Sequence, residues 1–506
     1  MSICKLATEF AISNGILKQV DGNPSILSCT LSPSPMPELL LRKAQGIQCD
    51  FNLLYHKAAM DHEFLEMVLK PILPVDPYLR SLWDVYLRTR GSENRQKIVL
   101  GLNRSDYMLH LHEDLCDTKK KFITHRLRNT KVAAEYEIET QDGVWDGLSL
   151  RQVEFNMIAS SFGGLLQRLI PQHRISLSLQ GLSKNLATRV PDCFPADRFS
   201  EALISACRMY VEDCSRRKLV PTKVSILVVV GENEGNIYDH RALIGQLLLR
   251  NPDIGVLYRS FNSLKTELKL DSDFRLFVND EEIAVVYFRT GYTPDAFPDN
   301  ETWDVKYQLE KSLAIKCPCI QYMLANTKII QAALSKPKYL SRFFQPNSSS
   351  YQNVLSTFAN QYTLDAEIGI SDSTEIQQVI NECMLKPENY VLKPQREGGG
   401  NNYFGEQLVQ KLKSIMNHHE RKDYVLMERI RPYVFENQVL NSFSKCNEPK
   451  VQEMVTELGI FGAILVCDDE IHLNEFSGHL LRSKPIECNE GGIVAGFGCL
   501  DSPFIT

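Results

Sequence analysis

The sequence predicts a mixed α/β fold divided among several subdomains, and three features support this class. Short runs rich in β-branched residues, such as 224–230, are typical of buried strands. Segments with apolar side chains at helical spacing, such as 242–250, follow these runs. The chain has 506 residues, of which 43% are hydrophobic, so it can bury a sizeable core in about two to four subdomains.

Within the first two thirds of the chain, a mostly helical part is expected to be followed by a part with both strands and helices. Up to about residue 170 the pattern is mostly helical, which predicts a helical shell. Two β-rich runs, 274–278 and 283–288, flank the polar residues 279–282 and predict a hairpin. The polar segment 346–351 is expected to be a surface connection to the next unit.

The last third is expected to carry the chemistry. A strand, a glycine-rich loop, a helix and a second strand are predicted, with the regular elements at 390–394, 406–416 and 424–430. The final part is predicted to contain strands at 451–466 and 471–473, separated by an acidic turn. We find no internal repeat in the chain.

Composition excludes several classes of partner. The formal charge is −6 and no run of five or more Lys and Arg residues occurs, so nucleic acid is not an expected partner. No stretch of about eighteen apolar residues is present and Glu9 interrupts the apolar N-terminus, so we expect neither a membrane span nor a secretory signal. The fourteen cysteines are scattered, which is typical of a cytoplasmic protein with reduced thiols.

The strongest local signal is the segment 393–405, in which the consecutive glycines Gly398 to Gly400 follow Lys393 and Glu397. Glycines let backbone amides approach phosphate oxygens without a Cβ clash. A lysine can place a charge on a phosphate, and a carboxylate can bind a magnesium ion that bridges phosphates. The segment favours a nucleoside triphosphate site, although an ordinary glycine-rich turn has the same composition. Its spacing matches neither a Walker nor a Rossmann phosphate loop.

Two further segments carry candidate ligand groups. Met427, Glu428 and Ile430 end a β-rich run and are candidates for the lining of an adenine pocket. Glu154 and Asn156 lie two residues apart in an extended segment, so both can offer an oxygen to one magnesium ion. Ordinary cores and solvated strand faces show the same two patterns.

Three arginines, Arg104, Arg289 and Arg482, each lie in a short segment bounded by apolar sequence. A guanidinium fork matches a carboxylate, so three of them suit a substrate with several carboxylates. Surface ion pairs are the alternative interpretation for each arginine.

Four segments, 391–402, 457–462, 478–484 and 491–496, together resemble the eukaryotic glutathione synthetase family. The resemblance lies in their sequences, in their order along the chain and in the distances between them. Further matches extend the resemblance from about residue 100 to the C-terminus, at 104–108, 154–156, 161–164, 234–236 and 286–289. Residues 1–100 carry no motif that we can match.

The resemblance implies an ATP-grasp-like ligase that acts as a homodimer. Such an enzyme uses ATP with a pair of Mg²⁺ ions, joins glycine to γ-glutamylcysteine through an acyl phosphate, and releases glutathione, ADP and phosphate. The implied division of the chain is a helical and core segment (1–220), a substrate-binding α/β domain (221–335), an ATP lid (336–450) and a C-terminal return to the core with a second glycine-rich loop (451–506).

The resemblance also implies a role for individual residues. The implied metal ligands are Glu154, Asn156 and Glu397. The residues implied around ATP are Glu154, Lys328, Lys393, Glu397, Gly398, Gly399, Gly400, Asn401, Asn402, Phe404, Met427, Glu428, Ile430, Glu457, Lys484 and Glu490. Those implied around γ-glutamylcysteine and glycine are Arg104, Ala159, Ser160, Ser161, Glu234, Asn236, His240, Arg289, Tyr292, Arg482, Ile493 and Val494. The implied catalytic residues are Lys328, Lys393 and Arg482.

Four positions depart from the family pattern. Ala159 stands where serine is usual, His240 where glutamine is usual, Val494 where alanine is usual and Phe404 where tyrosine is usual. With an ordinary pKa of about 6.5, His240 is expected to gain charge between about pH 8 and pH 6 and to tighten the binding of a donor that carries carboxylates. The alternative is a histidine that faces solvent or a backbone carbonyl near the pocket and does not contact the donor.

Two alternatives remain open at this stage. Val494 is compatible with a ligase that uses another acceptor, such as β-alanine or serine. A binding or regulatory subunit would be expected to have lost metal or phosphate ligands, whereas Glu154, Lys328 and Lys393 are all present.

Overall fold

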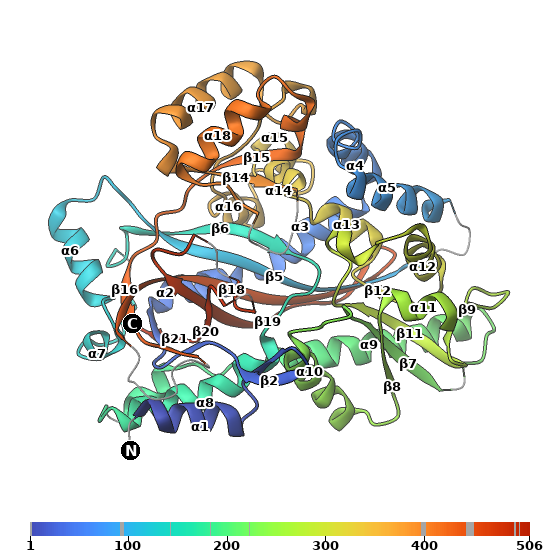
Figure 1. Cartoon of the computed structure of the whole chain (residues 1–506), viewed down its shortest axis with the longest axis horizontal. Helices are drawn as coiled ribbons and strands as arrows, with labels where there is room; N and C mark the ends of the chain where they lie inside the picture. Colours follow the sequence, from blue (N-terminus) through green and yellow to red (C-terminus); the bar gives the residue numbers. More distant parts are fainter. Residues whose placement is uncertain are drawn as a thin grey trace.

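The computed structural model describes residues 3–91, 96–141, 143–182, 184–221, 223–395, 401–441, 450–489, 492–494 and 496–506. It contains both helices and strands, so the predicted mixed α/β class is confirmed. Figure 1 shows a long twisted sheet across the middle of the molecule, with helices and smaller sheets around it. Within the described ranges, none of the helices combines the length and the apolar character that crossing a membrane requires.

The large sheet joins strands from both halves of the chain. The order across it is β17, β3, β20, β19, β18, β5 and β6, with β16 paired to β18. Its centre is a long antiparallel pair formed by β18 (Gln452–Cys467) and β19 (Glu470–Pro485). The other strands are β3 (Cys29–Thr30), β5 (Ile98–Leu111), β6 (Leu148–Asn156), β16 (Phe435–Asn437), β17 (Val439–Leu440) and β20 (Cys499–Asp501).

Helices from the first half of the chain surround this sheet. They are α1 (Ile3–Ser13), α2 (Glu38–Gly46), α3 (Gln48–Met60), α4 (His62–Leu69), α5 (Pro77–Arg90), α6 (Asp117–Arg126), α7 (Thr130–Ala133), α8 (Gly163–Leu179) and α9 (Pro195–Arg216). The expectation of a helical shell up to residue 170 is therefore wrong in part, since β5 and β6 lie within it.

The sequence of β5 does not show the pattern of a strand, because the centre of this strand is polar. Residues Asn103 to Asp106 are all buried, although each of them is polar or charged. A strand whose centre is polar on both faces lacks the alternation of apolar and polar residues by which a half-buried strand is recognised.

Neighbouring residues of β18 contact helices on opposite faces of the sheet. The ring of Phe461 packs edge-on against Phe199 of α9, whereas Gly462 lies directly under Gln48 and Asn52 of α3. Because successive strand residues point to opposite faces, α9 and α3 lie on opposite sides of the sheet. An added Cβ at Gly462 would come within 2.6 Å of the amides of both α3 residues.

A second sheet follows in the order β8, β7, β11, β10 and β9, with β12 beside β11. The predicted strand at 224–230 and the predicted hairpin at 279–282 are confirmed by β7 and by the antiparallel pairing of β10 with β11. The elements of this part are β7 (Val224–Val229), α10 (Ile237–Arg250), β8 (Gly255–Arg259), α11 (Phe261–Glu267), β9 (Leu268–Leu270), β10 (Leu276–Val278), β11 (Glu281–Phe288), α12 (Asn300–Lys311) and β12 (Ile315–Cys317).

A third unit lies above the large sheet in Figure 1. Its small antiparallel sheet has the order β13, β15, β14, and a separate apolar core joins that sheet to α17 and α18. The predicted strands at 390–394 and 424–430 and the helix at 406–416 are confirmed as β14, β15 and α18. The bounds are β13 (Gln361–Thr363), α17 (Ser373–Leu385), β14 (Tyr390–Pro394), α18 (Gly405–Ile415) and β15 (Tyr424–Glu428).

Short helices connect the second sheet to this unit. They are α13 (Ile320–Ala325), α14 (Lys328–Leu334), α15 (Pro337–Leu340) and α16 (Ser349–Leu355). The prediction of an irregular connection at 346–351 is wrong in part, because α16 begins there. Its first turn is stabilised by the Ser348 hydroxyl, which accepts from the backbone N–H of Tyr351 at 3.2 Å.

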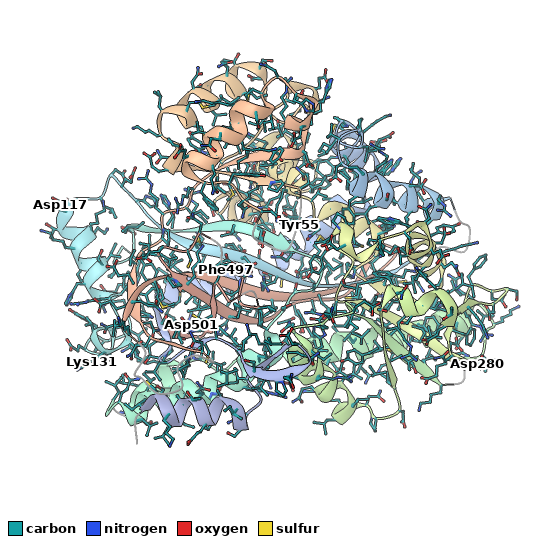
Figure 2. All side chains as sticks on the ribbon, in the orientation of Figure 1. Tyr55, Asp117, Lys131, Asp280, Phe497 and Asp501 are labelled. Carbon is teal, nitrogen blue, oxygen red and sulfur yellow. The ribbon has the colours of Figure 1, made fainter. Side chains whose placement is uncertain are left out.

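Segments near the two ends of the chain meet in a separate two-stranded sheet. β21 (Pro503–Ile505) pairs with β4 (Ser34–Met36), and the hairpin of β1 (Leu17–Val20) with β2 (Asn23–Ile26) lies beside α10 (Figure 1). Figure 2 shows Tyr55 and Asp501, which are both buried, within the body of the molecule. The exposed side chains of Asp117, Lys131 and Asp280 lie at its edges in the same view.

The close contact at Gly462 predicts a cost for any side chain there. We expect Gly462→Ala to lower the free energy of unfolding by about 1–3 kcal/mol, because α3 must move to admit the methyl group. Urea denaturation of the purified variant measures this change.

The matched control is Gly46→Ala in α2, where an added Cβ would meet nothing within 4 Å. We expect this control to change the free energy of unfolding by less than about 0.5 kcal/mol. Equal stability of the two variants would contradict the packing of α3 on β18.

Candidate active site

Strand register brings a set of polar side chains to one face of the large sheet. Across β5 and β6, Arg104 lies opposite Asn156, and Asp106 lies opposite Glu154. Directly paired residues share a face, as do residues two apart in one strand. The four side chains therefore form one patch.

The same patch continues onto β18 and β19. Asp106 lies opposite Gly459, and Glu457, two residues earlier in β18, lies opposite Arg482. An added Cβ at Gly459 would lie 2.9 Å from Cδ of Arg104 and 3.0 Å from Oδ1 of Asp106. The glycine therefore leaves room for the ion pair beside it.

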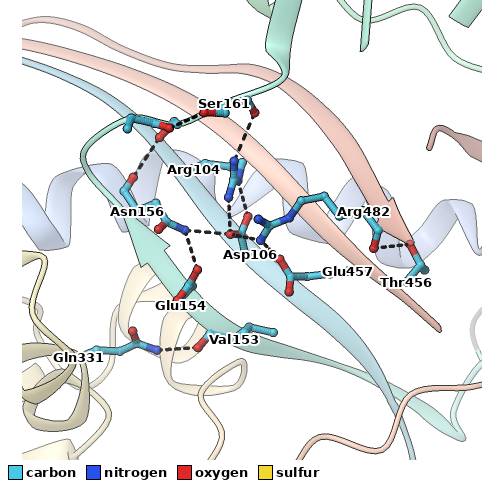
Figure 3. Close-up of polar contacts among 12 residues, drawn as sticks. Arg104, Asp106, Val153, Glu154, Asn156, Ser161, Gln331, Thr456, Glu457 and Arg482 are labelled. Atoms are coloured by element: carbon cyan, nitrogen blue, oxygen red, sulfur yellow. Dashed lines mark hydrogen bonds and ion pairs between the residues drawn. The ribbon is translucent and has the colours of Figure 1, made fainter. Parts of the chain in front are cut away.

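The carboxylate of Asp106 is the centre of this patch (Figure 3). Arg104 donates to both of its oxygens, from Nε at 2.6 Å and from Nη2 at 2.8 Å. Nη2 of Arg482 and Nδ2 of Asn156 donate to Oδ2 at 2.7 and 2.8 Å. Arg482 also contacts the carboxylate of Glu457. One fully buried carboxylate thus holds two guanidinium groups and an amide.

These contacts shift the pKa values of both arginines. Burial acts to lower the pKa of Arg104, but the charge of Asp106 and its hydrogen bonds outweigh burial and raise that pKa. Burial lowers the pKa of Arg482, and the neighbouring Arg104 lowers it further. The buried charge of Arg482 is therefore the less fully compensated of the two, so an additional anion beside it would be favourable.

Glu154 lies at the edge of the patch beside two lysines. Nζ of Lys328, the first residue of α14, is 2.7 Å from Oε2 of Glu154. Nζ of Lys393, in β14, donates to the backbone carbonyl of Val153 at 3.1 Å. Burial acts to raise the pKa of Glu154, but Lys328 and Lys393 outweigh it and hold that pKa far below its usual value. Glu154 is therefore ionised at neutral pH.

The patch lines a cleft of about 640 Å³, a volume typical of small-molecule sites. Residues from the third unit line the cleft as well. The predicted site residues that line it are Arg104, Glu154, Asn156, Ala159, Ser161, Tyr292, Lys328, Lys393, Asn401, Asn402, Phe404, Met427, Glu428, Ile430, Glu457, Arg482 and Lys484.

One wall of the cleft is apolar. Val391 and Met427 are buried together on β14 and β15, and Phe404 and Ile430 pack against them. The guanidinium group of Arg429 lies over the ring of Phe404, 5.4 Å from its centroid. Such a wall suits a flat heteroaromatic ring.

A second polar cluster adjoins the cleft around the buried side chain of Arg289. Nη2 of Arg289 donates to the Ser161 hydroxyl at 2.7 Å, and Nη1 donates to the Ser160 carbonyl at 3.1 Å. Nε donates to Nε2 of His240 at 3.0 Å. Because Nη1 of Arg104 donates to the Ser161 carbonyl at 3.2 Å, Ser161 connects this Arg289 cluster to the Asp106 patch.

The expectation that His240 titrates near neutral pH is wrong. Its side chain is only 2% exposed. Burial, and then the charge of Arg289, lower the pKa of His240 well below 6.5. Nε2 accepts from Arg289, so the neutral ring carries its proton on Nδ1. This Nδ1 is buried and has no hydrogen-bond partner within the described residues.

The loop before α10 adds two more predicted residues to the Arg289 cluster. Oε1 of Glu234 accepts from the backbone N–H of Asn236 at 2.9 Å and lies 3.9 Å from Nε2 of His240. Oδ1 of Asn236 is buried, and no atom of the described residues donates to it. The cluster therefore contains a buried donor and a buried acceptor that no atom of the described residues satisfies.

The segment between β6 and α8 has a strained backbone. Ala159 and Phe162 have φ values of 53° and 77°, which cost about 1–3 kcal/mol each for residues other than glycine. Asp239 stabilises the segment by accepting from the backbone N–H groups of Phe162 at 2.7 Å and Gly164 at 2.9 Å. This shape directs Ser160 and Ser161 toward Arg289.

Ile493 and Val494, two of the remaining predicted residues, lie where the C-terminal part returns to the sheet. Ile493 is buried, and the side chain of Val494 lies beside Gly235, the residue between Glu234 and Asn236. Nζ of Lys484 donates to the carbonyl of Asn489 at 2.5 Å. The predicted residues Glu397, Gly398, Gly399, Gly400 and Glu490 lie outside the described residues.

Two carboxylates that organise these clusters were not predicted as site residues. Asp106 follows Arg104 at the spacing of two residues that places both on one strand face, so its position was a usable signal. Asp239 offered no comparable signal, because it reaches the start of α8 from a helix more than seventy residues away in the sequence.

A family model and individual known proteins that resemble the chain all point to the same family. Residues 1–505 match the family model described as "Eukaryotic glutathione synthase, ATP binding domain". The chain is 35% identical to the glutathione synthetase of Homo sapiens over 99% of this chain and 96% of that protein. It is 33% identical to the glutathione synthetase large chain of Schizosaccharomyces pombe over 98% of this chain and 96% of that protein.

A solved structure supports the fold. A glutathione synthetase-like effector from Globodera pallida, in its apo form, superposes with a TM-score of 0.72 at 23% identity. The match covers 100% of this chain and 96% of that one. The large sheet and the units around it are therefore a known arrangement.

The shared carboxylate predicts a large effect of its removal. We expect Asp106→Asn to lower the free energy of unfolding by about 3–5 kcal/mol, because the buried Arg104 loses its counter-charge and Arg482 loses one of its two carboxylate partners. Denaturant unfolding measures the change.

The control is Asp84→Asn, which removes an exposed carboxylate 3.4 Å from Arg88 in α5. An exposed pair contributes about 0–1 kcal/mol, so this control should have nearly unchanged stability. An Asp106→Asn protein as stable as the control would show that Asp106 is not the organising charge.

Proposed function

The chain belongs to the eukaryotic glutathione synthase family, and we propose that the cleft and the adjoining Arg289 cluster together form its active site. The enzyme joins glycine to the carboxylate of γ-glutamylcysteine and converts ATP to ADP and phosphate. The proposal assigns the cleft to ATP and the Arg289 cluster to the dipeptide. The same proposal divides the chain at about residues 220, 335 and 450.

The observation that carries this assignment is the continuity between the two clusters. Arg104 contacts both the carboxylate of Asp106 and the carbonyl of Ser161. Ser161 in turn accepts from Arg289. A carboxylate bound beside Ser161 would therefore lie next to Arg104 and Arg482, within reach of a phosphoryl group held at the lysines.

The nucleotide end fits ATP in both charge and shape. Lys328 and Lys393 supply cations for the phosphates, and the apolar wall at Val391 and Met427 suits the adenine ring. We assign the remaining predicted ATP residues, including the loop Gly398 to Gly400, to the same nucleotide.

The oxygen ligands near the lysines fit Mg²⁺. Glu154 is ionised and Asn156 donates to it at 3.2 Å, so both lie at one place on β6. Within the described residues no group of three or more His, Cys, Asp or Glu side chains is arranged to hold a metal. A magnesium ion usually takes one or two protein carboxylates together with phosphate oxygens and water. Bound there with Glu397, it would neutralise phosphate charge.

The donor end fits a dipeptide with several polar groups. Arg289 can pair with a carboxylate, while Nδ1 of His240 and Oδ1 of Asn236 are a buried donor and acceptor without a partner among the described residues. A ligand that bonds to both atoms would remove the cost of their burial.

The side chains then act mainly by alignment and by charge neutralisation. Lys328, Lys393 and Arg482 stabilise the phosphoryl group as it moves to the γ-glutamylcysteine carboxylate. The glycine amine attacks the resulting acyl phosphate, phosphate leaves, and the amine loses a proton.

Two further parts of the proposal concern assembly and location. A homodimer is proposed from the family resemblance, and light scattering of the purified protein would test it. A cytoplasmic location is proposed because the cysteines in the described ranges are free thiols, as expected in a reducing compartment.

The function is tested by supplying ATP, Mg²⁺, γ-glutamylcysteine and an equimolar amino-acid mixture, followed by mass spectrometry of the product. We expect glutathione as the main product. A product that contains β-alanine or serine would instead identify another acceptor. Failure to consume ATP in the presence of the dipeptide would favour a binding or regulatory subunit.

The proposed metal site predicts the effect of removing a carboxylate. We expect Glu154→Gln to reduce turnover about 10²–10³-fold, because charge stabilisation at the phosphates is weakened. Steady-state assays over a range of Mg²⁺ concentrations should also show a higher requirement for the metal.

The matched control is Glu388→Gln, because Glu388 lines the same cleft but was not predicted as a ligand. Its turnover and magnesium dependence should remain near those of the natural protein. Equal behaviour of the two variants would remove Glu154 from the metal site.

The lowered pKa of His240 predicts a flat pH response at the donor site. The neutral ring is present above the ordinary pKa, and its contribution is lost only as pH falls through the lowered pKa. Between about pH 8 and pH 6, the KM for γ-glutamylcysteine should therefore change equally in the natural protein and in His240→Gln. A KM that falls toward pH 6 in the natural protein alone would show that His240 becomes charged.

A further inference from the structure

The N-terminal hairpin β1–β2 contacts two segments of the proposed active site. Nζ of Lys18 donates to the backbone carbonyl of Val494 at 3.0 Å. The backbone N–H of the next residue, Gln19, donates to the carbonyl of Gly235 at 2.9 Å. These contacts join residues near the start of the chain to a segment near its end and to the loop that carries Glu234 and Asn236.

The two contacted segments also pack against each other. An added Cβ at Gly235 would lie 3.0 Å from Cγ1 of Val494 and 3.6 Å from the carbonyl oxygen of Gln19. Gly235 therefore lies between the hairpin and the residues 492–494, which we call the C-terminal loop. We call the loop that carries Glu234 and Asn236 the donor loop. A change in the position of the hairpin would alter the distance between the C-terminal loop and the donor loop.

The hairpin is suited to this contact by its register. Gln19 pairs with Pro24 across the hairpin, and alternate residues of an antiparallel pair direct their N–H groups away from the partner strand. The N–H of Gln19 is directed to Gly235, outside the hairpin. The Lys18 side chain then reaches the carbonyl of Val494 from an exposed position.

Bonds within the C-terminal part shape the loop but do not join it to the donor loop. The N–H of Gly496 donates to Ile493 at 3.1 Å, and that of Phe497 donates to Gly492 at 3.0 Å. The bond from Lys18 is different, because it connects this turn to a separate element of the fold. Its removal should let the C-terminal loop move, and the turn that these bonds close should open more often.

We propose that the β1–β2 hairpin positions the C-terminal loop over the glycine site, with Lys18 as the positioning residue. The proposal rests on the proposed function and on the family resemblance, which implies that Ile493 and Val494 lie around γ-glutamylcysteine and glycine. It gives a role to the N-terminal segment, which carries no recognisable motif. Lys18 acts through the Val494 carbonyl and does not need to touch a substrate.

The test is Lys18→Met, which keeps most of the side-chain length and removes the ammonium group. An exposed hydrogen bond of this kind contributes little, so the KM for glycine should rise about two- to fivefold. The KM for ATP should stay unchanged, because the lysines of the cleft are not affected. The ratio of ADP to glutathione formed should rise, since a displaced loop gives water more access to the acyl phosphate.

Two variants control for charge and for folding. Lys18→Arg keeps a donor for the Val494 carbonyl and should restore the KM for glycine to near the natural value. Lys43→Met removes an exposed lysine from α2, away from this contact, and should leave the KM for glycine unchanged. Melting temperatures identify any loss of folding.

A measurement without substrates separates this proposal from the function itself. Amide hydrogen exchange at Phe497 should be faster in Lys18→Met than in the natural protein, whether or not the protein makes glutathione. Unchanged exchange together with an unchanged KM for glycine would overturn the positioning role. Faster exchange in a protein that forms no glutathione would support the contact and reject the proposed function.

Discussion

The buried carboxylate of Asp106 determines how the polar face of the large sheet can be built. Four cations and three carboxylates lie on this face or at its edge, namely Arg104, Lys328, Lys393 and Arg482 with Asp106, Glu154 and Glu457. Without Asp106, two guanidinium groups would share a low-dielectric site with no counter-charge between them. With Asp106 present, the net charge of the face is only slightly positive. A nucleoside triphosphate brings several negative charges, so magnesium ions would be needed to balance it.

The loops around the Arg289 cluster depend on this rigid face. Ser161 accepts from Arg289 through its hydroxyl and from Arg104 through its carbonyl, so one residue relates the two clusters. Its backbone lies between two left-handed residues, Ala159 and Phe162, and the carboxylate of Asp239 holds the second of these. Strain of this kind persists only where surrounding contacts determine the shape. The sheet therefore provides charged side chains in fixed positions. The hydrogen bonds of Arg104 and Arg289 to Ser161 hold the segment between β6 and α8 in place.

The chemical groups of the site could be predicted from the sequence. Which strands and side chains are buried around them could be predicted less well. Glu154 and Asn156 were predicted to share a strand face from their spacing, and β6 places them so. β5 was mistaken for part of a helical shell, because its polar centre is buried by the same ion pairs that make the site. The neutral state of His240 was not predictable either, since its burial and its contact with Arg289 bring together segments far apart in the sequence. Long-range contacts of this kind leave no local periodicity.

The polar atoms that remain unpaired suggest why the site is built from buried charges rather than from apolar residues. Nε of Arg482, Nδ1 of His240 and Oδ1 of Asn236 are all buried and have no partner within the described residues. Each such group costs about 1–3 kcal/mol in the folded protein, and a ligand that supplies the missing partner recovers this cost. The recovery is specific, because an analogue without the matching group leaves the cost in place. Under the proposed assignment, selectivity for a polar dipeptide is therefore gained in a site that is less stable when empty.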